Sequence, residues 1–227
     1  MRAHPRHHLA PYYRQQIYTV LKRFNRGDEV KPPRTPNPKN VGDRTRGWLA
    51  VQTAEHVMPV FEQGPFDLDE PSKDVLELPY LFLELARGIM EGRITIEVAN
   101  QRRPLTQDFA VMLGFARNEP ETFPVNATLA ALAIESAFED VLGWYEFDME
   151  DEDHQRRRLR PPSKKAEDEE LVWTGGDTAG TAGVAYSCGR LSTRCEPGRL
   201  DEFWTWWLTE ALPSAWEMAV KDATAQK

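Results

Sequence analysis

The chain has 227 residues, and its 28% charged and 41% hydrophobic residues are typical of a globular protein with a sizeable core. No apolar run approaches the ~18 residues of a membrane-spanning helix, and the basic start lacks the apolar segment of a secretory signal, so we expect a cytoplasmic protein. The net charge of −8 is uneven, because residues 1–46 hold eleven Lys and Arg against three acids and the remainder is strongly acidic.

The first 43 residues are predicted to form one helix and an extended arm. Pro11 suits the first turn of a helix that runs to about residue 24, and residues 26–43 contain four prolines and two glycines, which favour a linker. The apolar stripe of this helix is Tyr13, Ile17, Val20, Leu21 and Phe24. One alternative function is RNA binding, in which the basic residues of segment 2–46 contact the nucleic acid. The acidic body and the missing glycine and aromatic pattern argue against nucleic acid as the partner.

A central helix is predicted from about Asp43 or Arg44 to Gln63. Its apolar residues recur at three-and-four spacing and define one face: Ala50, Ala54, Val57, Met58 and Phe61. This face must be buried, so we expect the helix to run through the core. Pro59 lies inside the helix and is expected to bend it, because proline lacks a backbone donor and clashes with the preceding turn.

The next helix is predicted to begin near Pro71 and to be capped by Gly92, with Pro79 in its middle. Its buried stripe is Val75, Leu78, Phe82, Leu85 and Ile89. Residues 94–102 fit a short helix or a strand, and we favour a helix because no neighbouring segment offers a sheet.

Further helices are predicted at residues 106–116, 126–145, 178–186 and 200–220. Thr106 is expected to cap the first of them. Apolar stripes in the second and the last comprise Ala130, Ile134, Phe138, Val141 and Tyr145, and Leu200, Phe203, Trp204, Trp207, Leu208, Ala211 and Ala215. The helix at 178–186 is rich in Gly and Ala, which lets a neighbouring helix approach closely. Pro213 is expected to lie in the middle of the last helix.

Residues 146–170 are the most polar part of the chain and are predicted to form a long charged loop. They hold an acidic run at 148–153, a group of four arginines at 156–160 and a second acidic run at 167–170. An acidic surface of this kind can meet a basic protein, because complementary charge raises the rate of association.

The only acid–base pair on a predicted helix is Glu55 with His56. A zinc site on one helix needs a second His four residues away, and a site within a bundle needs several Glu and His from facing helices; the sequence offers neither pattern. We therefore expect no catalytic residues, no metal and no cofactor, and a buried, hydrogen-bonded His56. A metal-dependent helical-bundle enzyme that uses His56 and Glu55 remains the alternative.

The two cysteines, Cys188 and Cys195, are separated by six residues, which fits neither a zinc knuckle nor a redox C-x-x-C motif. A disulfide between them is geometrically possible. In a cytoplasmic protein we expect reduced thiols.

Residues 49–61, L-A-V-Q-T-A-E-H-V-M-P-V-F, resemble a helix of a family of bacterial immunity proteins, which are all-α proteins encoded beside polymorphic toxins. That family carries A-E-x-V-L-P-x-F-E here, followed by an acidic, proline-containing turn and a helix that ends in A-x-G. The corresponding segments of this chain are residues 67–71 and 86–88, and the small-residue helix at 178–186 is also similar. The resemblance implies an all-α fold, a cognate toxin as partner and no catalytic residues.

These features predict an all-α protein with a single bundle domain. Residues 1–43 form the helix and arm, and residues 44–227 form a bundle of about six to eight helices that contains the charged insert at 146–170. We expect an immunity protein whose acidic side chains mimic substrate phosphate and cover a basic active site of the toxin. The residues predicted to make this contact are Asp148, Glu150, Asp151, Glu152, Asp153, Glu167, Asp168, Glu169 and Glu170.

Overall fold

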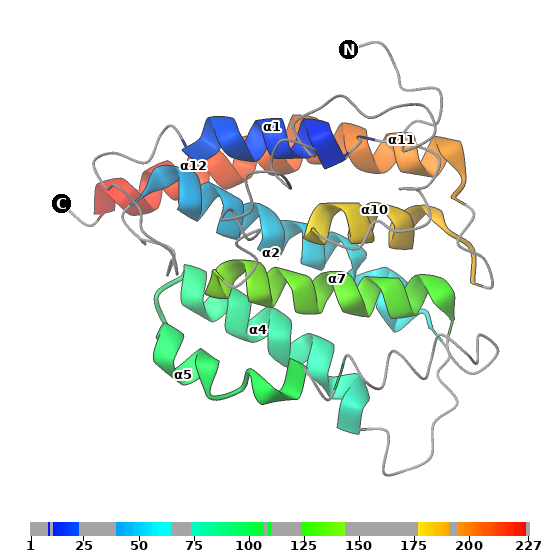
Figure 1. Ribbon diagram of the computed structural model, residues 1–227, viewed down its shortest axis with the longest axis horizontal. Helices are drawn as coiled ribbons and strands as arrows, with labels where there is room; N and C mark the ends of the chain where they lie inside the picture. The colour runs from blue at the N-terminus through cyan, green and yellow to red at the C-terminus, as the bar shows by residue number, and fades with distance from the viewer. Residues whose placement is uncertain are drawn as a thin grey trace, which may run out of the picture.

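The computed structural model confirms an all-α bundle (Figure 1). It describes residues 9, 11–22, 40–64, 74–106, 109, 124–143, 177–190 and 195–225, and contains no strand within these ranges. No helix in this part of the chain is both long enough and apolar enough to cross a bilayer. The elements in chain order are α1 (Pro11–Lys22), α2 (Val41–Glu62), η1 (Asp74–Glu77), α4 (Leu78–Met90), α5 (Ile96–Asn100), α7 (Val125–Leu142), α10 (Thr178–Ser187), α11 (Pro197–Trp206), η2 (Trp207–Ala211) and α12 (Leu212–Ala225).

Helix α2 is the centre of the bundle and packs on α7, α12, α10, α4 and α1 (Figure 1). The five apolar residues predicted for its face are all buried. Thr53, also buried, donates its hydroxyl to the carbonyl oxygen of Leu49 at 2.6 Å, which satisfies a polar group inside the core. Pro59 is exposed, and α2 continues past it for another turn. The placement of α2 through the core is therefore confirmed.

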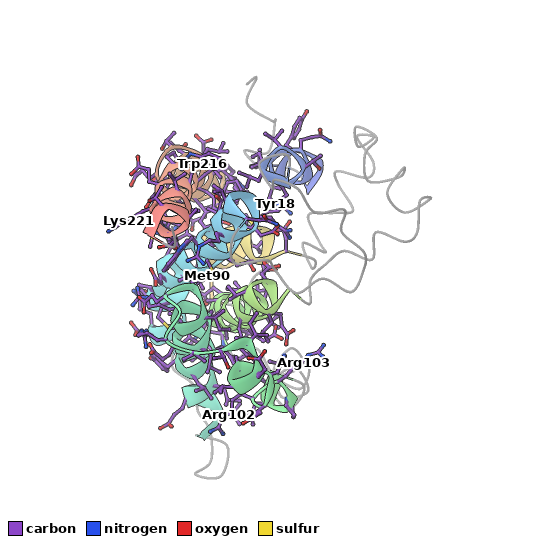
Figure 2. The ribbon with its side chains drawn as sticks, turned by 90° about the vertical axis from the view of Figure 1, so that its left-hand side faces the viewer. Tyr18, Met90, Arg102, Arg103, Trp216 and Lys221 are labelled. Carbon is purple, nitrogen blue, oxygen red and sulfur yellow. The ribbon has the colours of Figure 1, made fainter. Side chains whose placement is uncertain are left out.

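The C-terminal helices run antiparallel to α2, and side-chain hydrogen bonds connect the N-terminal part of α2 with η2 and α12. Asp222 near the end of α12 accepts from the indole of Trp48 at 2.9 Å and from the guanidinium of Arg44. Further along α2, the amide of Gln52 donates to Ser214 Oγ at 3.0 Å. Figure 2 places Trp216 and Lys221 of α12 at one end of the molecule and Arg102 and Arg103, which follow α5, at the other.

The predicted single helix at 200–220 is interrupted by a π-helical turn, η2, at Trp207–Ala211. The physical cause is Pro213, which lacks an N–H and whose ring clashes with the carbonyl four residues earlier. The N–H of Leu212 reaches back five residues to the carbonyl of Trp207, so the turn widens instead of breaking. The residues predicted for the buried stripe of this segment are all buried apart from Leu208, which is half-buried.

Helix α4 begins later than predicted, and Pro79 lies in its first turn rather than in its middle. This position suits proline, because the first N–H groups of a helix have no intrahelical partner. Gly92 follows the helix with φ +75°, which confirms the expected cap. The predicted start at Pro71 lies outside the described residues. The short helix α5 confirms the favoured interpretation of residues 94–102.

Two further expectations for side chains are wrong. In α1, Tyr13 and Val20 are 49% and 47% exposed, so its buried side is narrower than the predicted stripe. Thr106 does not cap a helix, because its hydroxyl donates to the carbonyl of Arg103 at 2.8 Å from within a helical turn. Phe24, Tyr145 and most of the helix predicted at 106–116 lie outside the described residues.

Helix α10 is almost entirely buried and consists mainly of small residues, as predicted. A Cβ atom on Gly183 would stand 3.1 Å from ring atoms of Phe203 and Trp204, so a larger residue would require these rings to shift by a few tenths of an ångström. On the same helix, a Cβ on Gly180 would stand 2.6 Å from the guanidinium of Arg14. These small residues let α10 pack closely on α7, α11 and α2, with Arg14 of α1 reaching its first turn.

Candidate functional site

The nine acidic residues predicted to contact a toxin all lie outside the described part of the chain. They are Asp148, Glu150, Asp151, Glu152, Asp153, Glu167, Asp168, Glu169 and Glu170. The alternative pair, Glu55 and His56, is well placed in the C-terminal half of α2. The surface that surrounds this pair is the candidate site.

His56 is held in a stack of aromatic rings. Its imidazole lies parallel to the indole of Trp206, with ring centroids 3.6 Å apart and planes inclined by 10°. The ring of Tyr186 from α10 stacks at 5.2 Å, and Phe203 of α11 closes the group at 5.9 Å. His56 is half-buried in this stack and not fully buried, and the contacts described for its ring are aromatic, which corrects the expectation of a buried, hydrogen-bonded residue.

This environment lowers the pKa of His56. Partial burial among the rings is the main cause, because an imidazolium ion is poorly solvated there, and the carboxylate of Glu210 opposes the effect. Burial in this stack therefore favours the neutral imidazole of His56 over the imidazolium.

An open groove of about 410 Å³ lies beside this stack and is named here the His56 groove. It is lined by Gln52, Glu55, His56, Trp206, Glu210, Ala211 and Ser214. Its wall combines a half-buried Trp ring with two carboxylates and two neutral polar groups. The π-helical turn at Trp207–Ala211 contributes Glu210 and Ala211, so the distortion forced by Pro213 shapes this wall directly.

Glu55 faces α4, where its carboxylate forms an ion pair with Arg87. Burial raises the pKa of Glu55 despite this neighbouring positive charge. Although Glu55 and His56 are adjacent in sequence, one pairs with a basic residue and the other stacks on rings. Within the described residues, no group of three His, Cys, Asp or Glu side chains is arranged to hold a metal ion.

A second polar feature, named here the Asp177 cluster, joins α1 to α2, α7 and α10. It comprises Arg14, Tyr18, Arg46, Asp140, Asp177 and Thr178, and it encloses a small cavity of about 20 Å³. Arg14 is 1% exposed, and its Nε donates to Asp177 at 2.8 Å. The other oxygen of Asp177 accepts from the N–H of Gly180 at 2.6 Å and thereby caps α10. Figure 2 shows Tyr18 beside α2 in this region.

Several carboxyl groups near this cluster are poorly solvated. Burial raises the pKa of Asp140 to about 6, although the hydroxyl of Thr178 donates to it at 2.6 Å. One turn earlier on α7, burial and the negative charges of Glu139 and Asp140 raise the pKa of Glu135 to about 7. Buried Glu139 itself lies 3.8 Å from Arg103. Burial disfavours the ionised forms of Asp140 and Glu135, whereas Glu139 has a nearby positive charge. None of the three lines the His56 groove.

In comparisons with protein-family models, with curated proteins and with solved structures, nothing matched this chain. The function must therefore be argued from its own residues.

Sequence patterns identified Glu55 and His56 but not the residues that complete the groove. Trp206, Tyr186 and Glu210 come from other elements, and no local spacing connects them with α2. The high count of seven Trp was the available signal, since such residues supply either buried area or binding anchors. Helical spacing correctly placed Trp207 in the buried stripe and left Trp206 out of it, but it did not show that Trp206 stacks on His56.

Proposed function

We propose that this protein binds and neutralises a cognate bacterial toxin in the cytoplasm and performs no reaction of its own. The observation that carries the proposal is the His56 groove, an open hollow with a stacked Trp206 ring and the carboxylates of Glu55 and Glu210. Aromatic anchors are enriched where protein interfaces gain most of their affinity. The resemblance of residues 49–61 to bacterial immunity proteins supports the same function, and this segment contains both Glu55 and His56.

The neutralising mechanism is occlusion of a basic active site. A toxin that acts on nucleic acid needs positive charge to hold its phosphates, and carboxylates can occupy the same positions. The acidic runs at 148–153 and 167–170 supply such carboxylates. The His56 groove gives the complex an anchor, because a Lys or Arg side chain of the toxin can pair with exposed Glu210 and lie against the edge of Trp206.

Co-expression with the product of the adjacent gene tests the proposal. We expect the pair to co-purify and cells that carry both genes to grow, whereas cells with the partner alone stop growing. Association should slow as salt rises, because the contact depends on opposite charges. The proposed function is wrong if the two proteins do not co-purify and the cells are not protected.

Two variants separate the contributions of the groove and of the insert. Glu210→Arg should weaken toxin binding by about tenfold or more, since it places a positive charge where a basic side chain is expected. Glu77→Arg is the matched control, because Glu77 in η1 is also exposed and does not line the groove. Changing the nine acidic residues of the insert to Asn and Gln should remove most of the binding. If only the insert variant loses affinity, the groove has no part in the complex.

A further inference from the structure

The two cysteines of the chain meet between α10 and α11. Cys188 directly follows α10, and Cys195 lies two residues before Pro197, where α11 begins. The two residues pair as an isolated antiparallel bridge, and their Sγ atoms are 3.2 Å apart. Neither cysteine is in a disulfide; Cys188 is buried and Cys195 half-buried. The N–H of Glu196 also donates to the carbonyl of Ser187 at 2.9 Å, so the backbone on both sides is fixed.

We propose that Cys188 and Cys195 form a reversible redox site that exchanges with small-molecule disulfides such as oxidised glutathione. The product is an intramolecular disulfide that closes residues 188–195 into a ring. This inference is independent of the proposed toxin partner, because it depends only on the local geometry of the two thiols.

The backbone already has the geometry that a disulfide needs. Directly opposed residues of an antiparallel pair have Cα atoms about 4.5–5.5 Å apart, and disulfides join Cα atoms about 4.4–6.8 Å apart. Because the two sulfur atoms already touch, bond formation requires only a small side-chain movement. A pair of cysteines that met by chance would rarely share both features.

The two thiols differ in reactivity. The hydrogen bond from Cys188 lowers the pKa of Cys195 to about 7, whereas the same contact and burial raise the pKa of Cys188. A thiol that titrates near the ambient pH is the best nucleophile in thiol–disulfide exchange. Cys195 is also the more accessible of the two, so it is the attacking thiol and Cys188 is the resolving thiol.

The exchange takes place in two steps. The thiolate of Cys195 attacks one sulfur of oxidised glutathione, the glutathione S–S bond breaks, and one glutathione thiolate leaves and takes a proton from solvent. Cys188 then loses its proton to solvent, and its sulfur attacks Cys195 Sγ in the mixed disulfide and releases the second glutathione. The protein loses two electrons and two protons in total, and these reduce one glutathione disulfide to two thiols.

Disulfide formation would connect the packing around the His56 groove with the ratio of oxidised to reduced glutathione. Tyr186, two residues before Cys188, stacks on His56, and the guanidinium of Arg199, four residues after Cys195, lies 4.9 Å from the Tyr186 ring centroid. The bond therefore fastens the end of α10 to the start of α11, the two helices that supply the aromatic rings around His56.

Mass spectrometry of the full chain tests the inference. The protein is equilibrated in glutathione buffers of increasing oxidised fraction, free thiols are alkylated, and the chain is cleaved with trypsin. We expect an alkylation-resistant monomer that is lighter by two hydrogens, and a tryptic fragment in which peptide 166–190 is joined to peptide 195–199. Cys195→Ser should lose the ring without gaining a stable glutathione adduct, because Cys188 is buried.

Cys188→Ser gives the complementary result. Cys195 should still react and should accumulate as a mixed disulfide with glutathione, because no second thiol is left to resolve it. Interchain dimers of the unaltered protein, adducts without the joined peptides, or two alkylated thiols under all buffers would each overturn the proposal.

Discussion

The two polar regions near the two ends of α10 differ in how their charged groups are placed. In the Asp177 cluster, charged groups are enclosed and satisfy one another: Arg14 pairs with Asp177 and Thr178 bonds to Asp140. In the His56 groove, the largest contacts are stacked rings, and Glu210 stands exposed at the opening. The same small-residue helix thus has an internal ion pair at its start and, at its end, a ring that stacks on His56 beside the groove.

This difference sets the structural role of the Asp177 cluster against the binding role that we propose for the His56 groove. Enclosed ionic groups are costly unless each has a partner, and partners consume the capacity to bind anything else. In the His56 groove, Glu55 is paired with Arg87, but exposed Glu210 and the edge of Trp206 remain accessible. The Asp177 cluster therefore holds α1 on the bundle, whereas the His56 groove leaves one carboxylate exposed at the surface.

Arg14→Met should produce the largest effect. It leaves Asp177 buried and without its cation, which costs about 3 kcal/mol or more of unfolding free energy. It also removes the contact of the guanidinium with the Trp204 ring, 5.4 Å away. Urea denaturation followed by circular dichroism measures the loss.

Arg93→Met is the control, because Arg93 pairs with Glu84 and Glu91 on an exposed surface and should leave the unfolding midpoint unchanged. Asp177→Asn keeps the cap of α10, since Asn is an equally good N-cap, and it removes only the ion pair. The double variant of Arg14 and Asp177 should then cost less than the two single losses added. Strict additivity would show that the pair is not coupled and that the cluster does not hold α1.

Sequence patterns predicted the helices far better than they predicted these two regions. The α2 face is periodic and apolar, so burial follows from spacing alone. The prediction for Pro213 was half right: its place inside the last helix was correct, but the π-helical turn that absorbs it was not foreseen. Arg14 and Asp177 are 163 residues apart, and no local pattern connects them. The packing of the helices decides which polar residues come into contact, and local sequence patterns do not predict that packing.

Asp140→Asn should stabilise the protein at pH 7.5, by about 1 kcal/mol. Burial raises the pKa of Asp140 to about 6, so its ionised form destabilises the folded state. The cost is absent below the ordinary carboxyl pKa of about 4 and fully present above the folded value. Asn can still accept from Thr178. The gain should therefore vanish in urea titrations at pH 4, and an equal gain at both pH values would exclude ionisation as its cause.

His56→Phe should produce the smallest effect on the free energy of unfolding. It tests whether protonation of His56 destabilises the ring stack. Phe keeps a flat ring against Trp206 but cannot be protonated. Because the pKa of His56 is lowered in the folded protein, the unfolded chain takes up the proton first as pH falls below about 6.5, and the folded state loses stability. The difference in unfolding free energy between His56→Phe and the unaltered protein should therefore widen by less than ~1 kcal/mol from pH 8 to pH 5. A difference that stays constant, or that narrows on acidification, would mean that the imidazolium is tolerated in the stack and that Glu210, not burial, controls its charge.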